Sequence, residues 1–254
     1  KTCKTVLLFK KGDLHDIGNY RPICLLSVVY KLFTRVILNR IDRIVDEGQP
    51  CEQGGFRKGF STMDHIHTLT RLTEVSREYK RPLCLTFIDL EKAFDSIEIE
   101  AVMEALASQG VPTQHMKILR ELHKNLSTKI SPFYNDINTG VKRGVRQGHT
   151  MSPKLFTATL QNVVRTLECD NMEVKIDGRQ IHHHRFHDDI VLITPDISQS
   201  ECMLANFDKA CGKIGLRLNL KKMMFMNNGL DWTASDWIPR DVKRTAGRPP
   251  TRWL

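Results

Sequence analysis

The chain has 254 residues, of which 41% are hydrophobic and 26% charged, a composition that is typical of globular proteins and excludes an intrinsically disordered chain. Its formal net charge of +9 favours a polyanionic partner such as nucleic acid. The seven cysteines never occur in a Cys-x-x-Cys spacing, which argues against a zinc ribbon or a disulfide scaffold and predicts an intracellular, reducing compartment. No apolar run approaches the length of a transmembrane helix, so we expect no membrane partner.

The first 50 residues predict a strand, an extended segment and a long helix. The apolar run 6–9 reads as a short strand, and residues 19–23 are expected to be extended because the residue before a proline avoids the helical region. The helix should begin after the N-cap Ser27 and end at Gly48. Arg21 is a candidate for contacts with phosphates. The apolar stripe of this helix, expected to face the core, comprises Val29, Leu32, Phe33, Val36, Ile37, Ile41, Ile44 and Val45.

A glycine-rich, basic loop follows at residues 53–60. Glycine lets backbone N–H groups approach a phosphate, and Arg57 and Lys58 add positive charge, so the loop is a candidate contact for nucleic acid. The alternative is a simple turn. Ser61 and Asp64 have the spacing of a capping box and predict the start of the next helix.

Two apolar segments end in carboxylates. The run 83–88 reads as a buried strand that ends at Asp89, and residues 185–193 read as a strand, a tight turn with Asp188 and Asp189, and a second strand. Adjacent carboxylates repel each other, and hard divalent ions such as Mg²⁺ relieve that repulsion. An Asp-Asp pair alone is often a solvated turn, but two acid-tipped apolar strands in a basic chain favour a metal site for phosphoryl chemistry.

The rest of the chain predicts further helices and hairpins and then a basic tail that lies apart from the core. Helices are expected at 97–109 before Gly110, from Thr113 onward, at 154–168 with Ser152 as N-cap and Pro153 at the first helical position, and at 198–214 before Gly215. Hairpin turns are expected at Asn135-Asp136 and Asp177-Gly178.

Taken together, these stretches resemble the reverse transcriptase domain of non-LTR (LINE-type) retrotransposons, most closely the RTE-like elements. The similarity covers roughly residues 5–228. The motifs that carry it are Lys11-Gly12-Asp13, Asn19 to Ile23, Gln53 with Gly55-Phe56-Arg57, Phe87 to Asp95, Gly144 to Gly148 with Ser152-Pro153, Phe186 with Asp188-Asp189, and Gly215-Leu216 with Asn219 and Lys222.

The resemblance implies an α+β fold, a right-hand polymerase with fingers and a palm in which helices back an antiparallel sheet. The implied parts are fingers at 1–82, palm with the first catalytic strand and helix at 83–110, a return to the fingers at 111–143, palm at 144–230 and a basic tail at 231–254. The thumb and the endonuclease of such elements are expected to be missing, since the chain passes from Asn228-Gly229 directly to a segment resembling the far C-terminal end of the elements.

The resemblance also implies an RNA-directed DNA polymerase that uses an RNA template, a DNA primer and deoxynucleoside triphosphates. Asp89, Asp188 and Asp189 would hold two Mg²⁺ ions, with Mn²⁺ as a substitute. The implied roles of other residues are proton transfer to pyrophosphate by Lys222, contact with the triphosphate by Arg21, exclusion of a 2′-hydroxyl by Phe94, support of the nascent base pair by Gln147 and Gly148, and contact with nucleic acid by Arg57, Lys58 and Arg146. Such a protein would act in the nucleus.

The sequence also departs from the family pattern, which leaves two alternatives. His187 stands where relatives usually carry alanine, and His149 where they usually carry aspartate. Together with the expected absence of the thumb and the endonuclease, these departures leave as the first alternative a catalytically inactive remnant of a retroelement that keeps some binding of nucleic acid. The second is a zinc or nickel site at His182 and His184, which share one face if residues 182–184 form a strand.

Overall fold

The computed structural model describes residues 2–50, 52–55, 59, 61–131, 136–165, 175–176, 179–180 and 182–227. The chain divides into two compact units. The first unit comprises Lys1–Cys51, Glu91–Leu167 and Lys209–Arg217, and the second comprises Glu52–Leu90, Glu168–Asp208 and Leu218–Leu254. The boundaries between fingers and palm stay predictions, because compactness alone defines these units. None of the described helices is both long enough and apolar enough to cross a bilayer.

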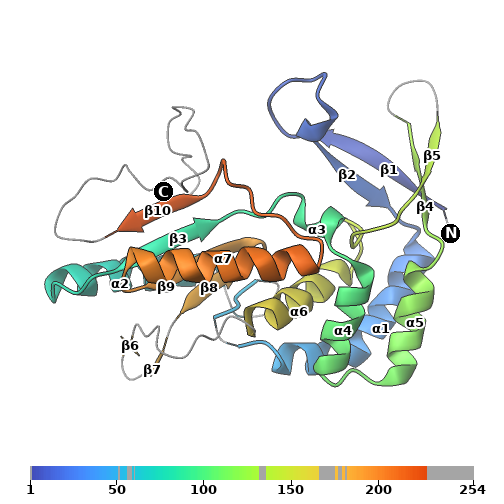
Figure 1. Cartoon of the computed structure of the whole chain (residues 1–254). Helices are drawn as coiled ribbons and strands as arrows, with labels where there is room; N and C mark the ends of the chain where they lie inside the picture. The colour runs from blue at the N-terminus through green and yellow to red at the C-terminus, as the bar shows by residue number, and fades with distance from the viewer. Residues whose placement is uncertain are drawn as a thin grey trace. The chain divides into compact units, whose positions relative to one another are not determined.

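The sheet of the first unit has the strand order β2-β1-β4-β5 (Figure 1). Its strands are β1 (Thr2–Phe9), β2 (Tyr20–Leu25), β4 (Ser127–Ile130) and β5 (Ile137–Gly140), and a short 3₁₀ turn, Ile17–Asn19, precedes β2. β1 pairs antiparallel with β2 and parallel with β4, and β4 pairs antiparallel with β5. The hairpin expected around residue 135 is therefore confirmed by its two strands, although Asn135 itself lies outside the described residues.

The described helices that lie wholly within this unit are α1 (Val28–Glu47), α3 (Ala93–Ser96), α4 (Ile99–Ser108), α5 (Thr113–His123) and α6 (Ser152–Arg165). Ser27 caps α1 as predicted, since its hydroxyl accepts a hydrogen bond from the Tyr30 N–H at 3.2 Å. The helix expected from residue 97 begins at Ile99, because a separate short helix forms first and Ile97 is extended between them. α6 is described only as far as Arg165, so its expected end at residue 168 is not described.

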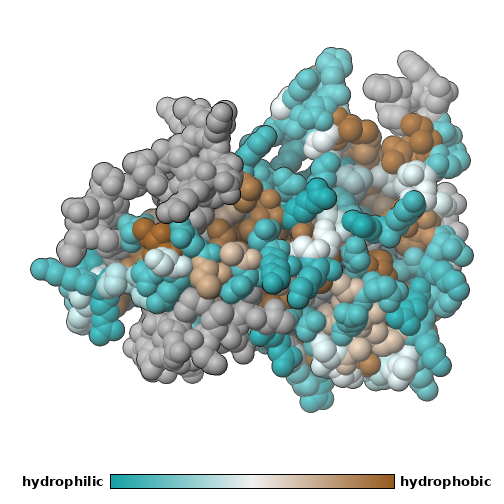
Figure 2. Space-filling view, in the orientation of Figure 1, coloured by the Kyte–Doolittle hydropathy of each residue, from teal (hydrophilic) through white to brown (hydrophobic). Residues whose placement is uncertain are grey.

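The apolar stripe of α1 was predicted correctly only in its C-terminal half. Ile37, Ile41 and Val45 are buried, and α1 contacts α6. The first half of the stripe is exposed, with Val29 at 78% and Leu32 at 65% exposed. Figure 2 shows other hydrophobic surface of this unit in the region of β1, β2 and β4. The helical period identifies which side chains share a face, but only the tertiary structure determines how much of that face is covered.

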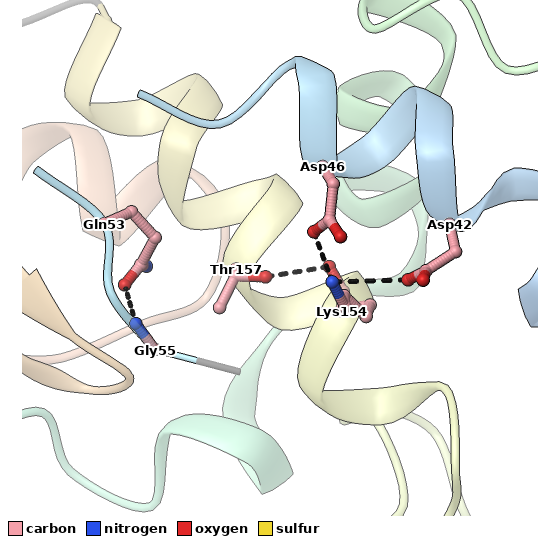
Figure 3. A network of polar contacts seen from close by, with 6 residues as sticks. All are labelled: Asp42, Asp46, Gln53, Gly55, Lys154 and Thr157. Atoms are coloured by element: carbon pink, nitrogen blue, oxygen red, sulfur yellow. Dashed lines mark hydrogen bonds and ion pairs between the residues drawn. The ribbon is translucent and has the colours of Figure 1, made fainter. Parts of the chain in front are cut away.

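An ion-pair network ties α1 to α6 (Figure 3). The Lys154 ammonium, on a side chain only 13% exposed, lies 3.2 Å from Asp42 Oδ1 and also pairs with Asp46 Oδ1. Asp42 and Asp46 come from successive turns of α1, so both carboxylates face the same lysine. A shielded cation between two acids is a structural contact that the charge pattern of α1 alone did not reveal.

The central sheet of the second unit has the order β10-β3-β9-β8 and is antiparallel throughout (Figure 1). Its strands are β3 (Cys84–Ile88), β8 (His183–Phe186), β9 (Asp189–Thr194) and β10 (Met224–Asn227). A two-stranded ribbon of β6 (Lys175–Ile176) and β7 (Arg179–Gln180) flanks the expected turn at Asp177-Gly178, which lies outside the described residues.

Helices pack on both faces of this sheet. α2 (Thr62–Glu78) begins with the predicted capping box of Ser61 and Asp64, and its Leu72 packs against Leu85 and Ile193. α7 (Ile197–Lys213) approaches the opposite face, where the Ser200 and Thr86 hydroxyls are 2.5 Å apart. Burial on both faces explains why β3 and β9 read as continuous apolar runs. The predicted α+β class, with helices backing an antiparallel sheet, is confirmed.

Candidate active site

Asp89 follows the last residue of β3 and lies at the same end of the sheet as the Asp188-Asp189 turn. β3 pairs with β9 from Cys84↔Thr194 to Ile88↔Ile190, so the next step of this register would set Asp89 opposite Asp189. Neighbouring residues in antiparallel strands are about 5 Å apart at Cα, and consecutive residues 3.8 Å, which brings the Cα atoms of all three acids within roughly 10 Å. The structure thus brings together the strand ends on which the sequence prediction depends.

The Asp89 carboxylate is held by two donors from the segment that follows α7. Lys222 Nζ donates to Asp89 Oδ2 at 2.6 Å, and Asn219 Nδ2 donates to the same oxygen at 3.1 Å. The Asn219 N–H also donates to the Asp89 carbonyl at 2.8 Å, and Leu90 pairs with Leu218 in an isolated bridge. This strand-like pairing fixes both the backbone and the side chain of Asp89. The sequence interpretation missed this contact of Asn219 with Asp89, although Asn219 belongs to a motif that carries the resemblance.

The turn between β8 and β9 is strained at His187. Phe186 pairs with Asp189, which leaves a two-residue turn, and the φ of His187 is +64°, a value that glycine adopts far more readily than histidine. Burial lowers the pKa of the His187 imidazole, while the Asp188 charge opposes that shift. Residues in such conformations typically cost about 1–3 kcal/mol and cluster at functional sites.

The start of the glycine-rich loop is bonded to β8 next to this turn. The Gly54 N–H donates to the Arg185 carbonyl at 3.1 Å, and the Arg185 N–H donates to the Glu52 carbonyl at 2.9 Å. Gln53 Oε1 accepts a hydrogen bond from the Gly55 N–H at 2.9 Å (Figure 3). A Cβ on Gly55 would lie only 2.4 Å from the backbone nitrogen of His187. Glycine is needed here for close contact with the turn that carries Asp188. Arg57 and Lys58 lie outside the described residues, so their predicted contact with nucleic acid stays a prediction.

The histidines of β8 form no chelating cluster in the structure. The rings of His184 and His65 meet edge to face with centroids 5.1 Å apart, and burial lowers the pKa of His184 to about 4. Among the described residues, no three His, Cys, Asp or Glu side chains are grouped so that they could hold a metal ion. The zinc or nickel site considered as an alternative at His182 and His184 therefore gains no third ligand among the described residues. The three acids are neighbours in the sheet but do not form a complete set of metal ligands by themselves.

In the first unit, α3 and the loop 144–148 hold the residues expected to support the nucleotide. Phe94 stacks on the buried ring of Phe156 with centroids 4.7 Å apart. The Val145 N–H donates to the Phe94 carbonyl at 2.6 Å, and the Gly144 N–H donates to the Ile97 carbonyl at 2.8 Å. These contacts fix the loop against α3, which carries Phe94, the residue predicted to exclude a 2′-hydroxyl.

Gln147 is held by a residue that the sequence interpretation left without a role. Gln147 Nε2 donates to Asp95 Oδ2 at 3.0 Å. Burial raises the pKa of Asp95 to about 6, and the charge of Lys92 and the hydrogen bond from Gln147 only partly offset this effect. The signal that could have identified Asp95 is its place at the end of the motif Phe87 to Asp95.

The same loop meets strand β2, which carries Arg21. The Cys24 N–H donates to the Gln147 carbonyl at 3.0 Å, and a Cβ on Gly148, whose φ is +91°, would lie 2.9 Å from the Cys24 carbonyl oxygen. Arg21 is exposed, three residues before Cys24 on the strand. Arg146 Nε and Nη2 are buried and make no hydrogen bond with the described residues. The structure therefore brings Gln147 and Gly148 into contact with β2 at Cys24, and Arg21 lies three residues earlier on the same strand.

His149, the second departure from the family pattern, is a buried structural residue. Its Nδ1 accepts a hydrogen bond from the Met151 N–H at 3.1 Å, and its ring packs edge to face against Tyr30 with centroids 5.4 Å apart. Burial, and next the charges of His123 and Arg146, lower its pKa to about 4. His149 is therefore neutral at physiological pH.

Comparison with known proteins identifies the family of this chain. Residues 9–247 match the family described as reverse transcriptase (RNA-dependent DNA polymerase). The retrovirus-related Pol polyprotein of retrotransposable element R2 from Nasonia vitripennis is 25% identical over 226 residues, which cover 86% of this chain and 21% of that protein. A probable RNA-directed DNA polymerase from transposon BS of Drosophila melanogaster is 29% identical over 198 residues, which cover 76% of this chain and 21% of that protein.

Among solved structures, an apo telomerase from Candida tropicalis matches with a TM-score of 0.63 at 14% identity, covering 91% of this chain and 51% of that one, and so supports the fold. The chain spans 21% of the length of each of the two curated relatives named above. The RTE-like assignment within the LINE-type elements stays a prediction. The chain belongs to the reverse transcriptase (RNA-dependent DNA polymerase) family, as a reverse transcriptase domain of the non-LTR retroelement type.

Proposed function

We propose that this chain catalyses RNA-directed DNA synthesis. In this reaction the 3′-hydroxyl of a DNA primer attacks the α-phosphate of a deoxynucleoside triphosphate, and pyrophosphate leaves. The observation that carries the proposal is the register of β3, β9 and β8, which sets Asp89 level with the Asp188-Asp189 turn. Membership of the reverse transcriptase family supports the same reaction.

Reverse transcriptases generally use divalent metal ions, and the donor set of this chain fits them. Carboxylate oxygens at the ends of adjacent strands are the hard ligands that Mg²⁺ and Mn²⁺ prefer. Asp89, Asp188 and Asp189 would hold two such ions, which would neutralise phosphate charge and lower the pKa of the primer hydroxyl.

Other residues of the chain would orient the reactants. Lys222, paired with Asp89 at 2.6 Å, keeps that carboxylate in place and is the candidate proton donor to pyrophosphate. Arg21 would contact the triphosphate, because a guanidinium suits bidentate contact with phosphate oxygens. Phe94, braced by Phe156, would exclude a 2′-hydroxyl by its bulk.

The nucleic-acid partners would be an RNA template and a DNA primer. Gln147 and Gly148 would support the nascent base pair, and Arg57, Lys58 and Arg146 would contact the phosphate backbone. The net charge of +9 supports such a partner, and binding should weaken as salt increases. Action in the nucleus follows from the same proposal.

The test is extension of a labelled DNA primer on an RNA template in the presence of Mg²⁺. We expect incorporation by the wild type and its loss in Asp188→Asn. The matched control is Asp208→Asn, which removes one exposed carboxylate of α7 and should leave incorporation unchanged. Binding of primer and template without incorporation, with either Mg²⁺ or Mn²⁺, would instead identify an inactive remnant and refute the proposal.

A further inference from the structure

In the described part of the chain, the side-chain amide of Gln147 is hydrogen-bonded through its NH₂ group only. Its Nε2 donates to Asp95 Oδ2 at 3.0 Å. Its Oε1 makes no hydrogen bond with the described residues. The amide therefore has one atom that is fixed by Asp95 and one that is available to a ligand.

The backbone holds Asp95 and Gln147 in a fixed relation. The Asp95 N–H donates to the Lys92 carbonyl at 2.8 Å within the turn that forms α3, and the Val145 N–H donates to the Phe94 carbonyl at 2.6 Å. Gly144, with a φ of +88°, lies so close that a Cβ there would be 2.7 Å from the Asp95 carbonyl oxygen. Because Gly144 and Val145 are bonded to residues on either side of Asp95, the backbone holds the start of the loop close to the Asp95 side chain.

A carboxylate and an amide pair in one orientation only. An ionised carboxylate accepts hydrogen bonds and cannot donate them, so Asp95 requires the NH₂ end of Gln147 to face it. The Oε1 end must then point away as an acceptor. An asparagine at position 95 could donate to Oε1, and the Gln147 amide could then turn over and present its NH₂ end instead.

We propose that Asp95 is a positioning residue that sets the polarity of the Gln147 amide, so that Oε1 is presented as a hydrogen-bond acceptor to the substrate. This inference rests on the proposed function, which places Gln147 beside the nascent base pair. The group that Gln147 recognises is then a hydrogen-bond donor, which excludes a phosphate oxygen. Asp95 acts through Gln147 and need not touch the substrate.

Three variants test the proposal against a merely structural role. Asp95→Asn lets the amide turn over, and Gln147→Glu alone sets two carboxylates against each other. In the double variant Asp95→Asn/Gln147→Glu, the asparagine NH₂ donates to one glutamate oxygen and the other oxygen again faces outward as an acceptor. The matched control is Glu104→Gln, which neutralises an exposed carboxylate on α4.

The first measurement is steady-state incorporation at varied nucleotide concentration. We expect Asp95→Asn to raise the KM for the nucleotide about tenfold, the effect of one hydrogen bond, with a smaller change in kcat. The double variant should recover most of this loss, whereas independent structural effects would multiply. A KM equal to the wild-type value in Asp95→Asn, or a double variant no better than the product of the single effects, would overturn the proposal.

The second measurement does not depend on polymerase activity. The side-chain NH₂ resonance of Gln147, observed by NMR in the wild-type chain, should shift with a midpoint near the Asp95 pKa of about 6. This titration should disappear in Asp95→Asn and persist in Glu104→Gln. If the wild type incorporates no nucleotide but this titration is seen, the proposed function fails while the positioning contact stands. A Gln147 resonance that does not respond to pH refutes the contact itself.

Discussion

Replacing Gly144 with alanine separates two costs at the loop that carries Gln147. The first is conformational: the φ of Gly144 is +88°, and a non-glycine residue in the left-handed region costs about 1–2 kcal/mol. The second is steric, because the new Cβ would lie 2.7 Å from the Asp95 carbonyl oxygen and 2.8 Å from its Cα. Both atoms belong to the backbone, so a side-chain rotation cannot relieve the clash, and a forced shift of this kind costs about 1–3 kcal/mol more.

Gly110 is the matched control, since its φ is +82° and a Cβ there would meet nothing within 4 Å. Gly110→Ala should therefore lower the free energy of unfolding by the conformational cost alone. Any gain from a stiffer unfolded chain is similar in both variants and cancels in the comparison. We expect Gly144→Ala to destabilise the protein by about 1–3 kcal/mol more than Gly110→Ala, measured by equilibrium denaturation with far-UV circular dichroism. Equal losses in the two variants would refute the close contact between this loop and α3.

Two further predictions concern buried charge. Lys154→Met leaves Asp42 and Asp46, which are 40% and 34% exposed, without their cation, and should cost about 1–2 kcal/mol because solvent screens the two remaining charges. Arg43→Ala removes an exposed ion pair on the same helix and should cost clearly less, so similar losses in thermal denaturation would show that the Lys154 network is not shielded. His149 in the folded chain takes up its proton near pH 4 and the unfolded chain near pH 6.5, so its contribution to stability is present above pH 6.5 and is lost as the pH falls towards 4. His149→Gln should remove up to about 3 kcal/mol of that acid-induced loss, and an unchanged dependence of stability on pH would contradict the burial of the ring.

Secondary structure could be predicted best from the sequence where an element is buried on both faces and therefore forms a continuous run of apolar residues. β3 and β9 are covered on both faces, so their runs could be recognised, and the acids that end them could be located. Ser27 and Ser61 likewise indicated where α1 and α2 begin, because capping depends on neighbouring residues.

Contacts between distant segments could not be predicted in the same way. The bond between Asp95 and Gln147 joins residues 52 positions apart, and only the fold brings them together. Asp42 and Asp46 of α1 pair with Lys154 of α6, which lies 108 positions after Asp46 along the chain, so their spacing within α1 does not reveal this partner. The strain at His187 is likewise a property of the closed hairpin and not of the residue itself.

The most direct test of the account is whether the ends of β3 and of the β8–β9 hairpin share a divalent ion. Mn²⁺ can be titrated into the ¹⁵N-labelled protein with primer and template present, and the broadening of amide signals reports distance from the ion. The account predicts that the amides of Asp89, Asp188 and Asp189 broaden first and together, and that Asp188→Asn weakens the effect at all three positions. Broadening at Asp188 and Asp189 without any at Asp89 would contradict it.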